Sequence, residues 1–351
     1  MFARPRRTAS ELHARRSIES SIGSGVPPDA VAFAARWWQL ETWLRELLYL
    51  ELRAKHGTAW EKVVEGRNQK RADLDADNKY MPSPDAEHLL AYTDTGSLLK
   101  LIATPETWEL VEPSLLPRVR WDGLVDALRD LRNRNAHVRR PHADDLARLE
   151  QALRDLEPGA RRALLAFNQQ RRWWKAEGDP LAVAWLERGH DDAKRLINHA
   201  RRQYGTDFTL SSSARPWVVA DQLGPISGRP GYFWHAEWTL HDGRFLSPRD
   251  FWHCYQLDRD NTRDLIVHVV QHYDGHVSVS FAAIDEPGAV ADAIGACFDA
   301  VITASHRHVS DRRRAAWAGE SRGLDPRVHV DSALAMMTED APFTVFAVGG
   351  T

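Results

Sequence analysis

Three side chains in the stretch LRDLRNRNAHVRR, residues 128 to 140, have the chemistry needed to cleave a phosphodiester. His137 can accept or donate a proton near neutral pH. The Arg132 guanidinium can bind a phosphate and stabilise the charge that builds on its oxygens. Asn133 can orient the imidazole or the phosphate by hydrogen bonding. Together these residue types suit the cleavage of RNA without a metal ion.

The spacing of apolar residues predicts the helix that positions these side chains. Five apolar residues recur at helical intervals: Trp121, Leu124, Val125, Leu128 and Leu131. The pattern predicts an amphipathic helix from about Val119 to Val138, which Pro141 ends. On that helix Asn133 and His137 share one face, because they are four residues apart. Arg132 projects about 140° away from His137, but its long side chain reaches toward the same opening.

Further helices are predicted on both sides of this one. The longest begins after the N-cap Asp29 and reaches about Lys55, where Gly57 stops it. Apolar residues cover most of its surface, which is typical of a central helix. Shorter helices are predicted over residues 86 to 92, 95 to 103 and 144 to 156. Residues 29 to 157 are therefore predicted to form an all-α bundle, and residues 1 to 28 a flexible arm.

This bundle resembles the HEPN superfamily of helical RNA- and nucleotide-binding domains. The family motif is an Arg, four to six residues and then a His, often with a polar residue directly after the Arg. Arg132, Asn133 and His137 fit that motif with a four-residue gap. The segments ETWLRELLYLEL and LLAYTDTGSLLKLI (residues 89 to 102) also look like the helices that precede the motif in this family. The resemblance covers residues 29 to 157 only.

The resemblance implies a metal-independent endoribonuclease. The ribose 2'-OH would attack the adjacent phosphate and leave a 2',3'-cyclic phosphate. His137 would act as general base or acid, and Arg132 would bind the phosphate. In this family two such domains usually pair, so a homodimer through the bundle is expected. Family members are common in bacterial toxins and antiphage systems, where a second domain senses the trigger.

Other polar residues around the motif have two interpretations. The cationic patch of Arg129, Arg134, Arg139 and Arg140 could track RNA phosphates. The motif residues Arg132, Asn133 and His137 also have a structural alternative, because cations near the end of a helix stabilise its negative dipole end and an amide can cap it, which requires no ligand. Asp94 could be a further polar residue of the active site, or only the N-cap of the helix that follows it.

The rest of the chain changes in character. Residues 158 to 213 are predicted to be a basic helical connector, which includes the run Arg171-Arg172-Trp173-Trp174-Lys175. Residues 214 to 351 are predicted to form a separate α+β domain. Its strands are expected over residues 217 to 223, 232 to 240, 265 to 272, 276 to 283 and 343 to 348, with a helix over 287 to 305.

The aromatic residues of this α+β domain exceed what one small core needs. Strand alternation places Trp234 and Trp238 on one face and His235 on the other. Either both faces are covered, or one carries an aromatic recognition surface, which we favour. We therefore interpret residues 214 to 351 as a sensor of a trigger ligand or protein. Its deletion is expected to leave RNase activity in place.

The amino-acid composition limits the classes of protein to which this chain can belong. Hydrophobic residues make up 43% of the 351 residues and the net charge is -3, so RNA must be held by a local patch. Two cysteines and the absence of an apolar run of about 20 residues favour a cytoplasmic protein. His268, His272 and His276 lack the cysteines or carboxylates that would complete a zinc site, and no phosphate-binding glycine loop occurs. We therefore expect neither metal nor cofactor.

The alternative to an RNase is a non-catalytic module that binds RNA or nucleotide, or that dimerises.

Overall fold

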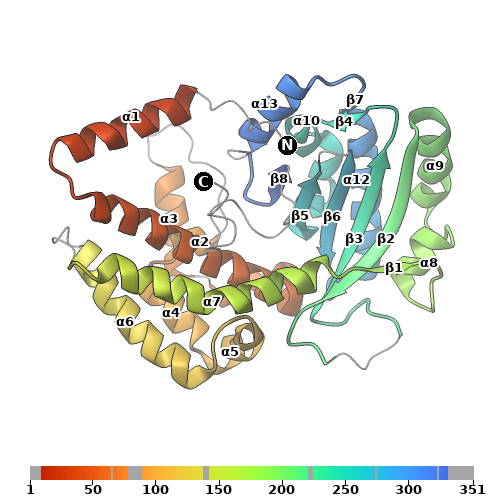
Figure 1. Ribbon diagram of the computed structural model, residues 1–351. Helices are drawn as coiled ribbons and strands as arrows, with labels where there is room; N and C mark the ends of the chain where they lie inside the picture. Colours follow the sequence, from red (N-terminus) through yellow and green to blue (C-terminus); the bar gives the residue numbers. More distant parts are fainter. Residues whose placement is uncertain are drawn as a thin grey trace. The chain divides into compact units, whose positions relative to one another are not determined.

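The computed structural model combines an N-terminal helical region with a C-terminal mixed sheet and its helices (Figure 1). It describes residues 9–64, 66–77, 89–136, 142–219, 224–272, 275–321 and 324–330. These residues divide into two compact units. The first contains the chain up to Leu44 and from Ser114 to Arg161. The second contains Arg45–Pro113 and the chain from Arg162 onward.

The first unit is entirely helical. It contains α1 (Ala9–Gly23), the first part of α2 (Pro28–His56), α6 (Arg118–Ala136) and most of α7 (Asp145–Asn168). Its buried apolar residues include Phe33, Leu40, Trp43, Trp121, Val125, Leu128, Leu149 and Leu156. The prediction of a flexible arm over residues 1 to 28 needs correction, because Ala9–Gly23 is helical. This helix has exposed side chains and is supported by local pairs such as Arg15–Glu19 at 2.9 Å.

The second unit begins with the remainder of α2 and a series of short helices. These are η1 (Gly57–Val63), α3 (Arg67–Ala76), η2 (Leu89–Tyr92), α4 (Thr95–Ile102), α5 (Pro105–Val111) and η3 (Glu112–Ser114), which ends at the boundary between the units. The predicted helical bundle over residues 29 to 157 is therefore not one compact unit. The reason lies in the second half of α2, where Tyr49 Oη donates to the Val267 carbonyl at 3.1 Å and Arg53 Nη2 to the Leu265 carbonyl at 3.0 Å.

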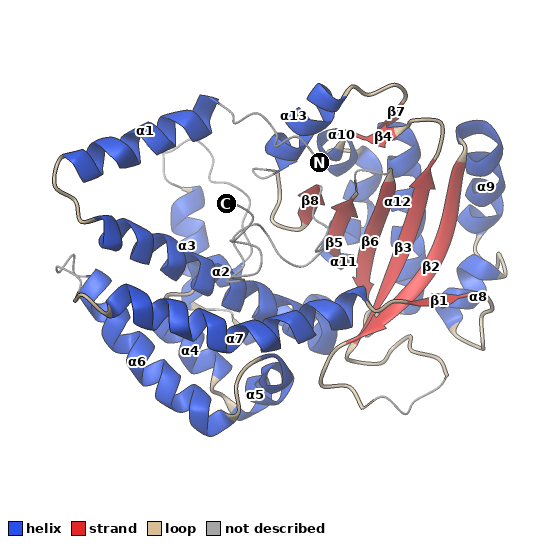
Figure 2. Ribbon diagram, viewed as in Figure 1, coloured by secondary structure: helices blue, strands red, loops and turns tan. Residues whose placement is uncertain are grey.

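A six-stranded sheet forms the centre of the second unit (Figure 2). In spatial order its strands are β1 (Arg171–Trp173), β2 (Thr206–Ala214), β3 (Tyr232–Leu240), β6 (His276–Ala282), β5 (Ile266–Gln271) and β8 (Val328–Val330). Neighbouring strands are antiparallel except β5 and β8, which are parallel. Two short strands, β4 (Phe245–Leu246) and β7 (Ser305–His306), pair separately.

The predicted connector over residues 158 to 213 also needs correction. It contains β1 and β2, together with α8 (Pro180–Leu186), α9 (Asp191–His199) and η4 (Ala200–Tyr204). The α+β region therefore starts well before residue 214. The sequence of β2, TDFTLSSSA, has few of the residues that favour strands. It forms a strand because nine of its residues pair with β3.

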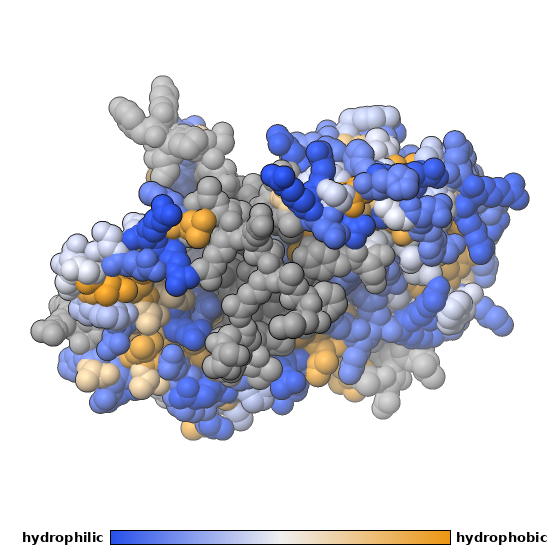
Figure 3. Space-filling model, turned by 45° about the horizontal axis from the view of Figure 1, so that its top comes forward, coloured by the Kyte–Doolittle hydropathy of each residue, from blue (hydrophilic) through white to orange (hydrophobic). Residues whose placement is uncertain are grey.

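One face of the sheet packs against α12 (Pro287–Ala304). Trp234 and Trp238 lie on this face, and Phe298 of α12 contacts the Trp238 ring edge-on at 5.6 Å. α12 is long and apolar enough to cross a membrane by length and composition alone. Ten of its residues are buried against the rest of the protein, as in the core helix of a soluble domain. On the face of the molecule drawn in Figure 3, the described residues are mostly hydrophilic, with hydrophobic residues in small groups.

The opposite face of the sheet is polar and also covered. His235 is buried there between Ser213 and Ser280, each 2.8 Å from one of its ring nitrogens. Phe167 of α7 contacts the His235 ring at 4.9 Å, and Tyr49 of α2 lies 6.0 Å from His268. Because Trp234 and Trp238 are buried on the other side, the aromatic residues fill cores on both faces. The strand alternation is confirmed, but these two tryptophans do not form the open recognition surface that we favoured.

Candidate active site

Helix α6 carries two of the predicted catalytic residues, Arg132 and Asn133, near its C-terminal end. Its apolar stripe is buried, whereas Asn133 is exposed and Arg132 half-buried. The described helix ends at Ala136, one residue before His137. His137, Arg139 and Arg140 lie outside the residues that the structure describes. Arg132 and Asn133 are therefore the two motif residues whose surroundings are known.

The three described arginines in the last two turns of α6 differ in their partners. Arg129 Nη1 lies 3.1 Å from an Asp126 carboxylate oxygen on the same exposed surface. Arg134 makes two hydrogen bonds to Asp145, at 2.6 and 2.9 Å. Arg132 has no carboxylate partner among the described residues.

The Arg134–Asp145 pair joins the end of α6 to the start of α7. The Asp145 side chain is only 4% exposed and also accepts a hydrogen bond from the His142 backbone N–H at 3.0 Å. The hydrogen bond from Arg134 holds the pKa of the Asp145 carboxyl below its usual value. The two residues thus connect the C-terminal end of α6 to the N-terminal end of α7. Of the four arginines predicted to contact RNA, Arg129 and Arg134 are engaged with carboxylates of the protein itself.

Asp94 has the geometry of a helix N-cap. Its carboxylate accepts hydrogen bonds at 3.0 Å from both the backbone N–H and the hydroxyl of Ser97 in α4. Arg71 approaches the same carboxylate at 3.5 Å. The Ser97 backbone N–H holds the pKa of Asp94 below its usual value. Asp94 belongs to the second unit and α6 to the first, so the structure does not bring it together with Arg132 within one unit.

The other polar clusters of the sequence have structural partners. Trp173 is buried in the hydrophobic core of the second unit, whereas Trp174 is 74% exposed, with the Arg172 guanidinium 4.2 Å from its ring centroid. His272 and His276 have rings 5.7 Å apart. Within the described ranges, no three His, Cys, Asp or Glu side chains are grouped to hold a metal ion. Cys254 and Cys297 are both buried and free, and burial raises the pKa of the Cys297 thiol.

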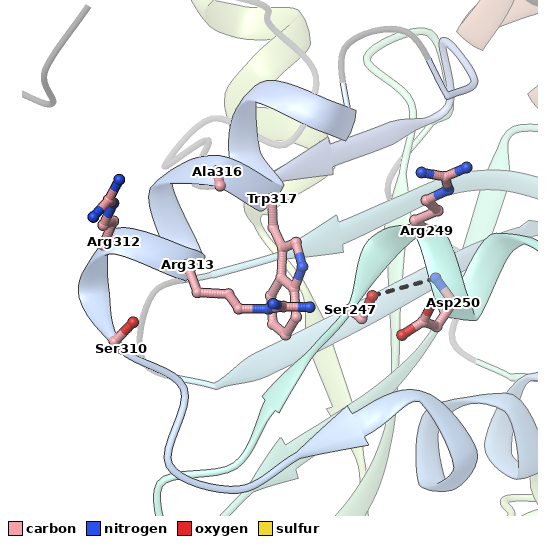
Figure 4. Close-up of a pocket in the computed structure, with 8 residues that line it drawn as sticks. All are labelled: Ser247, Arg249, Asp250, Ser310, Arg312, Arg313, Ala316 and Trp317. Atoms are coloured by element: carbon pink, nitrogen blue, oxygen red, sulfur yellow. Dashed lines mark hydrogen bonds between the residues drawn. The ribbon is translucent and has the colours of Figure 1, made fainter. Parts of the chain in front are cut away.

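Sequence reasoning missed a second polar feature, a pocket between residues 247 to 250 and 310 to 317 (Figure 4). The consecutive cations Arg312, Arg313 and Arg314 beside Trp317 were the available signal.

Comparison with known proteins finds no matching family model, no curated relative and no similar solved structure. The functional interpretation therefore rests on the residues of this chain.

Proposed function

We propose that this protein is a HEPN-type, metal-independent endoribonuclease of the cytoplasm whose active site contains Arg132, Asn133 and His137. The observation that carries the proposal is the difference between neighbouring arginines on α6. Arg129 and Arg134 are each paired with an aspartate, whereas Arg132 has no such partner among the described residues and adjoins the exposed Asn133. Those two pairs balance charge within the protein, whereas Arg132, near the C-terminal end of the helix, combines a favourable position in the helix dipole with a guanidinium that can bind a phosphate.

The proposed reaction is a transesterification within RNA. The 2'-oxygen attacks the adjacent phosphorus and the bond to the 5'-oxygen breaks, which yields a 2',3'-cyclic phosphate and a 5'-OH. His137 accepts the proton of the 2'-OH. The Arg132 guanidinium binds the non-bridging oxygens, where negative charge increases in the transition state, and Asn133 orients the phosphate.

Pairing of two copies supports both halves of the proton transfer. The leaving 5'-oxygen needs a proton while His137 is receiving one, so a second acid is required. In a homodimer through the helical bundle, the partner subunit's His137 supplies it. We propose that such a dimer is a toxin-like effector in antiphage defence, regulated by a trigger that the sheet-containing region binds.

The deciding experiment is expression of the wild type beside His137→Ala in bacteria, followed by sequencing of RNA ends. Wild type is expected to produce new 5'-OH ends with matching 2',3'-cyclic phosphates, and the variant is not. Association of both proteins with RNA without new ends would instead assign the bundle to the non-catalytic binding module. Absence of both cleavage and RNA association would contradict either function.

A further inference from the structure

A cavity of about 600 Å³ lies in the second unit, between the N-terminal parts of α10 (Pro248–Trp252) and α13 (Asp311–Ser321) (Figure 4). Its polar lining includes three arginines and two serines: Arg249, Arg312, Arg313, Ser247 and Ser310. Trp317 of α13 also lines it. This volume is within the range of sites that hold small organic ligands.

The charge of the cavity lining is unbalanced. Arg249 and Arg312 are exposed, and neither has a carboxylate partner in the described parts of the chain. The carboxylate of the lining, Asp250, already lies 3.1 Å from a ring nitrogen of His306. The lining therefore has three guanidinium groups and one carboxylate, which already has its own partner, so the cavity favours an anion.

Trp317 positions one of these cations. Its ring is 5% exposed and stacks on the buried Phe245 at 6.1 Å, with 20° between the planes. The Arg313 guanidinium lies 5.4 Å from the Trp317 ring centroid, and Figure 4 shows it extended across the indole. A guanidinium held against an aromatic ring keeps its N–H groups free at its edges, where they can bind a phosphate in a bidentate manner.

We propose that this cavity binds a phosphorylated ligand of nucleotide size through Arg249, Arg312 and Arg313. A single carboxylate would leave most of this positive charge unmatched, whereas a di- or triphosphate matches it with several oxygens. The exposed Ser310 adds a hydroxyl to the lining, whereas the hydroxyl of Ser247 is buried and caps α10 by accepting from the Asp250 backbone N–H at 3.3 Å. The inference does not depend on RNase activity, because the cavity belongs to the second unit and α6 to the first.

Calorimetric titration of the full chain with ATP, adenosine and inorganic phosphate tests the proposal. ATP is expected to bind, inorganic phosphate to bind more weakly and adenosine not to bind. Each of Arg312→Ala and Arg249→Ala is expected to weaken ATP binding roughly ten- to one-hundredfold, since each removes charged hydrogen bonds. Arg202→Ala is the matched control, because it removes an exposed arginine of the same unit far from this cavity in the sequence. Added salt is expected to weaken binding.

Two further measurements identify the source of the phosphate and check that the variants fold. A short single-stranded RNA that displaces ATP, and that loses affinity in the same two variants, would identify RNA phosphates as the source of the ligand. Circular dichroism checks that the exposed substitutions leave the fold unchanged, and Arg312→Gln serves as a second variant. Adenosine binding as tightly as ATP, or ATP affinity unchanged in both alanine variants, would overturn the proposal.

Discussion

Glu51 of α2 and Arg215, the residue after β2, form an ion pair with no exposed side-chain surface. Arg215 donates through Nε to Glu51 Oε2 at 3.0 Å and through Nη2 to Oε1 at 2.5 Å. The Trp217 indole N–H donates to the same carboxylate at 2.7 Å, and Arg215 Nη1 to the Ala163 carbonyl at 3.4 Å. The pair thus joins three chain segments inside the second unit.

Removing one member of this pair is expected to destabilise the fold strongly. Glu51→Ala leaves a buried guanidinium without its counter-charge and should lower the free energy of unfolding by about 3–5 kcal/mol. Asp122→Ala is the control, because it removes one member of the exposed Arg118–Asp122 pair and should cost less than about 1 kcal/mol. Urea unfolding followed by tryptophan fluorescence measures both. Equal effects of the two substitutions would contradict this account of the buried pair.

The buried His235 predicts a pH dependence of stability. Burial lowers the pKa of His235 to about 4, from an unfolded value near 6.5. As the pH falls below about 6.5, the unfolded chain binds a proton that the folded chain does not, so stability decreases until about pH 4. The loss from this residue is about 3 kcal/mol in total. Unfolding curves at pH 7.5, 6 and 5 measure the trend. His235→Asn should show a shallower pH dependence whatever its absolute stability, and an unchanged slope would contradict the assignment.

The long elements were predictable from sequence pattern. The periodic helices α2, α6 and α12, the aromatic strand β3 and the valine-containing strands β5 and β6 lie where their patterns indicate. β2 was missed because a strand with three consecutive serines is determined by its neighbours and not by its composition. A strand was predicted over residues 217 to 223, but the described part, Trp217 to Val219, is not a strand. The Trp217 indole N–H instead donates a hydrogen bond to the buried carboxylate of Glu51. The last predicted strand, residues 343 to 348, lies outside the described residues.

The candidate site was predictable in part. A helical repeat of 3.6 residues is enough to place Arg132 and Asn133 at the end of α6. No periodicity reveals that Arg134 pairs with Asp145, eleven positions later, or that Arg249 and Arg312 share one cavity although 63 positions separate them in the sequence. Those relationships depend on tertiary packing, which a single sequence does not display.

Substitution of neighbouring arginines on α6 should separate catalysis from stability. Arg132→Ala is expected to lower the cleavage rate at least about a hundredfold with no change in unfolding, because it removes charge stabilisation in the transition state. Arg134→Ala should instead lower the free energy of unfolding by about 1–3 kcal/mol, because Asp145 loses two hydrogen bonds while it is nearly buried. Cleavage by the wild type should persist in EDTA. Inhibition by EDTA that added metal reverses would exclude the metal-independent mechanism.

Chemical cross-linking tests the proposed homodimer. Asp130→Cys places an exposed thiol two residues before Arg132 and three before Asn133, and the two native cysteines are buried and do not compete. If the two motifs face each other across a twofold axis, a short bis-maleimide should link two copies in high yield. Arg202→Cys, exposed in the other unit, is the control and should link poorly. A monomer by light scattering, or equal linking at both positions, would argue against this dimer.

Deletion of residues 214 to 351 is expected to abolish folding of the second unit, contrary to the independent domains that the sequence indicated. A chain ending at residue 213 loses β3, the main partner of β2. The truncated chain also loses Arg215, the ion-pair partner of the buried Glu51 carboxylate. Tyr49 loses its hydrogen bond to the Val267 carbonyl, and Arg53 loses its hydrogen bond to the Leu265 carbonyl. Each polar group that is left buried without a partner costs about 1–3 kcal/mol of folding free energy, and a charged group costs more. The sum of these costs approaches the whole folding free energy of a typical domain.

Far-UV circular dichroism and thermal unfolding of the truncated chain measure the result. A cooperative transition with the helical content of residues 28 to 168 would show instead that the helices fold without the sheet. Any effect of the sheet-containing region on RNA cleavage is then better tested in the full chain, with Arg312→Ala, than by truncation.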